Sequence, residues 1–254
     1  MPHLLETLAV VLGVGLLMAL IVLVKDRLAP VREDDGTRED VAEYIAMMVS
    51  VLYAIVLGLC LVSVWDNRVS AEDHVQAEAS ALHQTYLLAA SLPEERRAPL
   101  REAARAYAAH VVDVEWPRMA ARGPLLEEGW TMLDRIRVAG EVGDSATVAQ
   151  KIAAQEVLAQ LGYVDDARRN RETAAQERLS PVLWTGLILG GVLTLAFMFL
   201  FGINRSGTHM VMVMGLAGFI AFTVLLVHQL DSPFGGMLSA SADPFTRYFA
   251  SGRP

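Results

Sequence analysis

Four runs without a charged residue dominate this sequence and limit the folds that it can adopt. They cover residues 7–24, 44–65, 181–203 and 206–230. An α-helix rises about 1.5 Å per residue, so roughly 20 residues cross the hydrocarbon core of a bilayer. Each run is long enough to cross, or nearly so. The sequence therefore predicts an integral membrane protein with four transmembrane helices.

The charge distribution agrees with this prediction. The chain is 54% hydrophobic although its formal net charge is −8, so the apolar and charged residues must be segregated along it. The first run could be a secretory signal peptide, but Glu6 precedes it, no Lys or Arg does, and no small-residue cleavage pattern follows Val24. We interpret it as a retained membrane helix, and four spans place both termini on one side of the membrane.

A hydrophilic insert, residues 66–179, separates the second run from the third. It holds 14 Lys and Arg against 19 Asp and Glu, so nothing in it favours nucleic acid as a partner. Its apolar residues recur at helical spacing, and no segment alternates as a strand would. Two such sets of apolar residues, each aligned along one helix face, are called seams below. They are Val75, Ala79, Leu82 and Tyr86, and Leu100, Ala104, Tyr107, Val111 and Val114.

Proline and acidic residues suggest where the helices of the insert begin and end. Pro93 followed by two glutamates predicts a helix start, and Pro117 predicts a helix end. A further helix is expected around Trp130 and a long one from Ser145 to Leu179. We therefore predict an all-α fold with four parts: a first transmembrane pair in 1–65, the insert in 66–179, a second pair in 180–231, and a polar tail in 232–254.

Several of these segments carry a resemblance when taken in order. They read "VSVWDNRV", "EASALHQTYLLAASLP", "YAAHVVDVEWPRM", "LSPVLWTGLILGG", "FGIN" and "LDSPFGG". In this order they resemble the bestrophin-like family of bacterial membrane proteins, a domain of unknown function. The resemblance implies four helical spans with a long insert, and a distant relation to bestrophins, which are oligomeric anion channels. The calcium-binding acidic cluster and Phe-lined neck of animal bestrophins have no counterpart here.

The second run carries a stripe of small and polar residues, which are Ser50, Tyr53, Cys60, Ser63 and Asn67. Their spacing of 3, 7, 3 and 4 places them on one helix face. Such a stripe is typical of a pore lining, and also of a face that packs against another helix. On the third run Gly186, Gly190 and Thr194 are four residues apart, which favours close helix packing.

The ionisable groups near the ends of the runs are candidates for a pore mouth or a membrane boundary. They are Arg68 after the second run, and His228 and Asp231 at the end of the fourth. His228 and Asp231 are three residues apart, so an imidazole–carboxylate contact is available to them. Asp231 also precedes "SPFGG", whose proline and glycines end a helix.

The sequence does not favour an enzyme, a metal site or a cofactor. No His-Glu-x-x-His, nucleophile elbow or phosphate-binding glycine loop is present, and the six histidines lack metal-ligand spacing. Cys60 is the single cysteine, so an intrachain disulfide is excluded. Glu115, in "EWPRM", is expected to anchor a helix end and not to act in catalysis.

The residues leave two functions open. One is a homo-oligomeric channel that passes small ions with weak selectivity, with the second span lining the path. The other is a non-transporting membrane scaffold or sensor whose helical insert binds a protein partner. The family resemblance implies a multi-pass protein of the bacterial inner membrane. Arg and Lys are spread over both sides of the spans, so the positive-inside rule does not fix the side that carries the insert.

Overall fold

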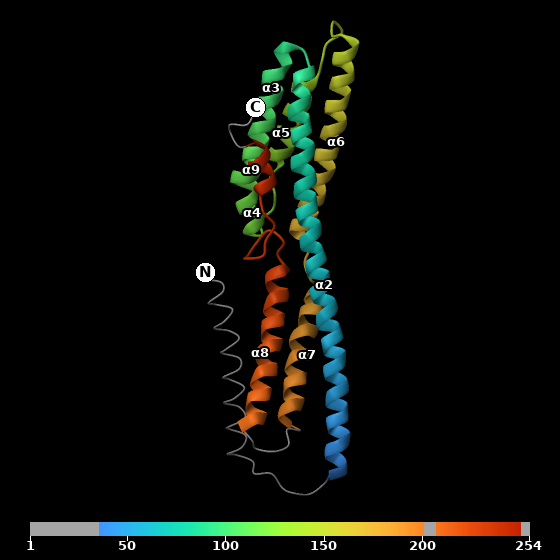
Figure 1. The fold of residues 1–254 in the computed structure, drawn as a ribbon, viewed down its shortest axis with the longest axis vertical. Helices are drawn as coiled ribbons and strands as arrows, with labels where there is room; N and C mark the ends of the chain where they lie inside the picture. The colour runs from blue at the N-terminus through green and yellow to red at the C-terminus, as the bar shows by residue number, and fades with distance from the viewer. Residues whose placement is uncertain (1–35, 201–206, 250–254) are drawn as a thin grey trace. The chain divides into compact units, whose positions relative to one another are not determined.

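The computed structural model describes residues 36–200 and 207–249, and these residues contain helices and no strand. Figure 1 labels the longer helices. In chain order the helices are α2 (Gly36–Leu88), the 3₁₀ turn η1 (Ala89–Ser91), α3 (Glu94–His110), the π turn η2 (Val111–Glu115), α4 (Trp116–Ala120), α5 (Glu127–Gly140), α6 (Val148–Gln176), α7 (Pro181–Leu200), α8 (Gly207–Leu230) and α9 (Asp243–Phe249). The predicted first span, 7–24, lies outside the described residues.

The chain divides into two compact units. The first comprises Met1–Trp65 and Arg178–Asp231, and the second comprises Asp66–Glu177 and Ser232–Pro254. Helix α2 contributes to both, because its 53 residues continue from the apolar run into the polar sequence without a break. In the first unit α7 and α8 lie side by side (Figure 1). Its core contains Tyr53, Leu57, Cys60 and Val64 of α2 with Leu187 of α7.

Two described helices, α2 and α8, are long and apolar enough to cross a membrane, and α7 adds a third if it is counted together with α6. The described residues leave most of the apolar surface of these helices uncovered. Only 17% of the apolar window of α2 and 22% of that of α8 is buried. Apolar surface of this extent is rare on a soluble monomer, which indicates that lipid or another protein covers it.

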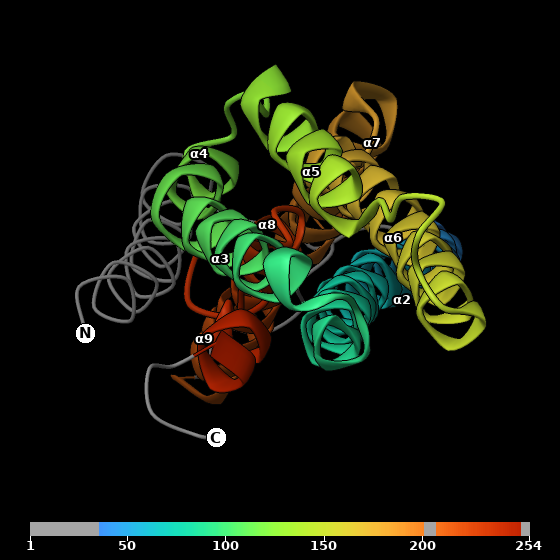
Figure 2. The same cartoon turned by 90° about the horizontal axis from the view of Figure 1, so that it is seen from above.

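The second unit is a bundle around an apolar core. Helix α5 packs between α3 and α6 (Figure 2). The predicted seams point inward: Val75, Ala79 and Leu82 of α2 are at most 1% exposed, and Leu100, Ala104 and Tyr107 of α3 are fully buried. In contrast with the expected polar tail, the segment after Asp231 packs into this core through Phe234, Ala240 and Phe245.

One predicted helix end is wrong. Pro117 does not end the helix that starts after Pro93, because α3 passes through the π turn η2 into α4, where proline occupies the first turn. Pro117 lies two residues beyond the π turn, where the regular i→i−4 hydrogen bonding that a proline disrupts is already interrupted. A π turn contains more residues than an α turn, so the inward position after Val111 falls on Glu115 and not on Val114. Glu115 is fully buried, whereas Val114 is partly exposed.

Candidate functional site

The polar stripe of α2 is divided between covered and uncovered positions. Tyr53 and Cys60 are 7% and 5% exposed and belong to the core of the first unit. Ser50 is partly exposed and its hydroxyl donates to the carbonyl of Ala46, 2.8 Å away. Ser63 is exposed, and Asn67 is partly exposed. The chain therefore covers the Tyr53 and Cys60 positions and leaves Ser63 open.

Glycine on α7 allows Tyr53 to pack closely. A Cβ atom at Gly190 would lie 2.5 Å from Cδ2 of Tyr53, and one at Gly191 would lie 3.0 Å from its hydroxyl. Thr194 is 3% exposed, one turn further along. At Gly186, by contrast, a Cβ atom would meet nothing within 4 Å. The close approach on α7 therefore lies at Gly190 and Gly191.

Asp231 joins the end of α8 to the start of α7. Its backbone N–H donates to Val227, which completes the last turn of α8. Its carboxylate accepts from the backbone N–H of Leu179 at 2.7 Å and from the indole N–H of Trp184 at 3.1 Å. The side chain thus satisfies two donors at the start of α7, a position where negative charge is also favoured by the helix dipole.

No direct contact joins His228 to Asp231 among the described contacts, although the sequence made one available. His228 is exposed, and its ring lies edge-on to Trp184 with centroids 5.6 Å apart. Trp184 therefore stands between the two residues: it donates to Asp231 and contacts the imidazole of His228.

Replacing Asp231 with alanine should destabilise the first unit by about 1–2 kcal/mol, because the buried N–H of Leu179 and the indole N–H of Trp184 lose their acceptor. The measurement is thermal unfolding in detergent, followed by tryptophan fluorescence. His228→Ala is the matched control, since it removes a ring contact and no hydrogen bond. Equal unfolding temperatures for Asp231→Ala and the wild type would show that the carboxylate is not a structural acceptor.

The second unit buries a network of charged side chains that links three segments. Arg168 and Arg171 come from α6, Glu78 from α2 and Glu115 from η2, and all four are 0% exposed. Glu115 accepts from Arg168 at 2.6 and 2.9 Å and from Arg171 at 2.7 Å. Glu78 accepts from Arg171 at 2.6 and 3.0 Å. Two buried arginines thus meet two buried carboxylates, and the partly exposed Glu172 lies 3.3 Å from Nε of Arg168.

Uncharged residues pack against this network. The hydroxyl of Tyr107 donates to Glu78 at 2.6 Å and accepts from Arg168 at 3.0 Å. The guanidinium carbon of Arg168 lies 5.0 Å from the ring centroid of Trp130. A side chain at Gly129 would collide with Arg168 and Glu115. Every carboxylate oxygen of the network therefore has a donor, which is the condition for burying charge at tolerable cost.

The network alters the pKa values of its members. Burial tends to raise the pKa of Glu115, but the hydrogen bonds and charges of Arg168 and Arg171 outweigh it, and the pKa falls below its ordinary value. Burial likewise tends to lower the pKa of Arg171, and Glu78 reverses this. Burial, with Glu78 beside it, raises the pKa of Tyr107 well above its ordinary value. At neutral pH the carboxylate and the guanidiniums are charged and the phenol is neutral.

Sequence reasoning missed this network. It interpreted Glu115 as a helix-end anchor, and the structure corrects this, since the carboxylate is buried between Arg168 and Arg171. A usable signal was present: Glu78 lies within the seam of Val75, Ala79 and Leu82. A charged residue inside an apolar seam implies a buried partner, because an unpaired buried charge is too costly.

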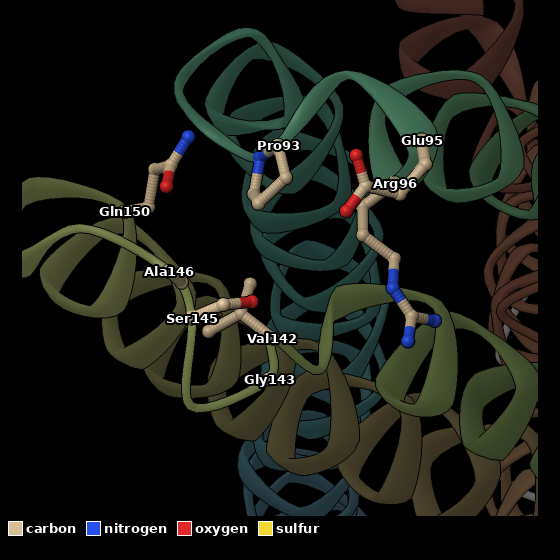
Figure 3. A pocket seen from close by; sticks show the side chains of 8 residues that line it. All are labelled: Pro93, Glu95, Arg96, Val142, Gly143, Ser145, Ala146 and Gln150. Carbon is tan, nitrogen blue, oxygen red and sulfur yellow. The ribbon is translucent and has the colours of Figure 1, made fainter.

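Two other features, the contacts of Arg68 and a surface pocket, do not indicate a functional site. Arg68 pairs with Glu72 at 2.7 Å and donates to the carbonyl of Leu238, so it belongs to the second unit and its C-terminal segment. A pocket of about 390 Å³ lies between the start of α3 and the loop before α6 (Figure 3). Its charged groups, Glu95 and Arg96, are opposite in sign and neighbouring in sequence. We assign no ligand to it.

Comparison with known proteins agrees with this architecture. The fold is similar to the crystal structure of a membrane protein variant, with a TM-score of 0.60 and 16% identity over 96% of this chain and 97% of the other. It is also similar to a bacterial bestrophin homologue from Klebsiella pneumoniae carrying a Tyr-to-Ala mutation, with a TM-score of 0.57 and 16% identity over 96% and 99%. A search of the curated proteins finds no match.

These observations define the protein as an all-helical membrane protein in its described residues, with two or three candidate spans. A family model for the bestrophin-like domain matches residues 12–245. The chain belongs to the bestrophin-like family, as the resemblance in the sequence implied.

Proposed function

We propose that the protein is a homo-oligomeric ion channel of weak selectivity, with four transmembrane helices and the second unit as an insert between the second and third. Residues 7–24 supply the first helix of this arrangement. The bacterial inner membrane is the proposed location. Membership of the bestrophin-like family supports the proposal, because the family resembles oligomeric channels.

The observation that carries the proposal is the uncovered part of the α2 stripe. Helix α2 uses one face, Tyr53, Leu57, Cys60 and Val64, to pack within its own unit. Ser63 lies outside this face and is exposed near the end of the apolar run 44–65 of α2. A serine hydroxyl that faces lipid finds no hydrogen-bond partner there. If several copies of α2 surrounded a common axis, Ser63 of each copy would face a polar path along that axis.

The residues proposed to line the path predict how it selects ions. Ser50, Ser63 and Asn67 are uncharged, and neutral hydroxyl and amide groups discriminate weakly between ions. Arg68 follows at the proposed mouth, where its charge would set any preference between anions and cations. His228 and Asp231 are proposed boundary groups, and the hydrogen bonds of Asp231 give it a structural role there.

The proposal is tested by ion flux through purified protein in liposomes. Ser63→Trp should reduce flux by more than about tenfold, because an indole fills a path lined by serine hydroxyls. Val62→Trp is the matched control: Val62 precedes Ser63 on the same helix, is 56% exposed and lies about 100° around the helix from it, so its flux should be unchanged.

Two readouts keep this test decisive. Size-exclusion chromatography with light scattering must give the same oligomer for both variants, so that lost flux is not lost assembly. In a Cys60→Ala background, cysteine at 63 should react with a water-soluble thiol reagent and cysteine at 62 should not. If folded wild-type protein passes no ion over a range of voltage, pH and calcium concentration, the channel is ruled out.

The second candidate is a membrane scaffold or sensor whose helical insert binds a protein partner. The observation that favours it is the burial of Tyr53 and Cys60 against the chain's own helices, which is what a packing face predicts. In that case position 63 is also covered in the assembled protein. Protection of cysteine at 63 from the thiol reagent, together with absent flux, would favour this candidate.

A further inference from the structure

A row of arginines on α3 has no carboxylate partner in the part of the chain that the structure describes. Arg97, Arg101 and Arg105 are four residues apart and therefore lie along one face of the helix. The ion pairs within the described residues include none of the three. This is unexpected in an insert where 19 acidic residues outnumber 14 basic ones. Like charges four residues apart repel each other, so an unpaired row calls for an explanation.

Two of these arginines converge on one tyrosine of α2. The guanidinium carbons of Arg101 and Arg105 lie 5.1 and 5.0 Å from the ring centroid of Tyr86. Arg105 also donates a hydrogen bond to the hydroxyl of Tyr86. Arg97 is held differently, since its Nε donates to the carbonyl of Leu92. The ring of Tyr86 therefore gathers two positive charges that form no ion pair within the described residues.

Aromatic side chains from α2 and α9 complete one wall of this cluster. The imidazole of His83 stacks with Tyr86 and with Tyr248 at centroid distances of 6.3 and 4.8 Å. Phe249 contacts Tyr86 edge-on at 5.9 Å. The hydroxyl of Tyr248 is held by Gln76 at 3.0 Å. These contacts hold the polar groups in fixed positions. A ligand binds such groups more tightly than it binds a flexible charged surface, because less conformational entropy is lost on binding.

Two polar atoms of the cluster have no partner among the described residues. Nε of Arg101 and Nδ1 of His83 are buried and make no hydrogen bond. Burial lowers the pKa of His83, so its imidazole is neutral at neutral pH and carries one ring N–H. Buried polar atoms are seldom left unpaired in folded proteins, so the N–H of Arg101 Nε indicates a missing acceptor and Nδ1 of His83 a missing hydrogen-bond partner. Glu102 is one residue from Arg101 and three from Arg105, but it is exposed and forms no ion pair with either.

We propose that Arg101, Arg105, Tyr86 and His83 form a binding site for a phosphoryl group. A phosphoryl group carries several acceptor oxygens, and guanidinium groups match such oxygens with paired hydrogen bonds. The hydroxyl of Tyr86, which already accepts from Arg105, has its own proton to donate. The group could belong to a soluble phosphate compound or to a lipid headgroup, and both present the same oxygens to the arginines. This proposal does not depend on the protein being a channel.

The first test titrates inorganic phosphate into purified protein in detergent, at constant ionic strength set with chloride. Thermal unfolding and calorimetry should both show saturable binding. In the double variant Arg101→Gln, Arg105→Gln the dissociation constant should rise by more than about tenfold, because two charged donors are lost. Arg135→Gln is the matched control, since Arg135 is an exposed arginine of α5, and it should bind phosphate as the wild type does.

The second test distinguishes the source of the phosphoryl group. Protein in nanodiscs of phosphatidylcholine alone is compared with protein in nanodiscs that also contain phosphatidic acid. Stabilisation by phosphatidic acid that disappears in the double variant, without binding of inorganic phosphate, would identify a lipid headgroup. The double variant must unfold cooperatively without ligand, which shows that it is folded. If wild type and double variant respond alike to both ligands, or to neither, the arginines only stack on Tyr86 and the site does not exist.

Discussion

Replacing Glu115 with alanine should destabilise the second unit by about 3–5 kcal/mol, the cost of removing one partner from a buried ion pair. Glu115 is fully buried and accepts hydrogen bonds from both Arg168 and Arg171. Without it Arg168 keeps only the partly exposed Glu172, which is 3.3 Å from its Nε, because Glu78 pairs only with Arg171. Urea unfolding in detergent, followed by circular dichroism, gives the free energy.

Asp113→Ala is the matched control for this change. Asp113 is an acid of the same π turn, but it is exposed, so its loss should change stability by less than about 0.5 kcal/mol. A fall of less than about 1 kcal/mol for Glu115→Ala, on the scale of exposed ion pairs, would mean that water reaches the network.

The same residue predicts a dependence on pH. The pKa of Glu115 is lower in the folded protein than its ordinary value of about 4.3. A carboxylate of this kind stabilises the fold above its unfolded pKa, and the stabilisation is lost as pH falls through the folded value. The stability difference between wild type and Glu115→Ala should therefore be constant near pH 7 and shrink below about pH 4.

The sequence predicts the helices of this protein better than it predicts what joins them. Apolar spacing identified the seam of Leu100, Ala104 and Tyr107, because inward positions recur every three or four residues in any packed helix. Pro93 predicted the start of α3 correctly. Pro117 misled the prediction, because it occupies the first turn of α4, where a proline is tolerated.

The buried network could not be read in the same way. Glu78 and Arg171 are 93 residues apart, and Glu115 and Arg168 are 53 apart. Local periodicity contains no information about pairing over such distances. Arg168 and Arg171 continue the inward positions of Leu161 and Val164 along α6. Charges at inward positions were the signal, and their partners follow only from the packing of three segments.

Gly190→Leu should destabilise the first unit by about 3 kcal/mol, the upper part of the range for adding side-chain volume to a packed core. A Cβ atom at Gly190 would already lie 2.5 Å from Cδ2 and 3.0 Å from Cε2 of Tyr53. An aromatic ring offers no flexible end that could move aside, so α2 and α7 would have to separate. Thermal unfolding in detergent measures the effect, and gel filtration reports any loss of assembly.

Gly186→Leu is the matched control, since a Cβ atom there meets nothing within 4 Å. Its leucine should change stability by less than about 0.5 kcal/mol, because it fills space outside the packed face of the same helix. Truncating the ring should also rescue the larger change: the double variant Tyr53→Ala, Gly190→Leu should be more stable than the sum of the single effects predicts, because the leucine occupies the vacated volume. Strict additivity would show that Gly190 and Tyr53 are not in contact in the membrane, and α2 would then be free to turn its polar stripe elsewhere.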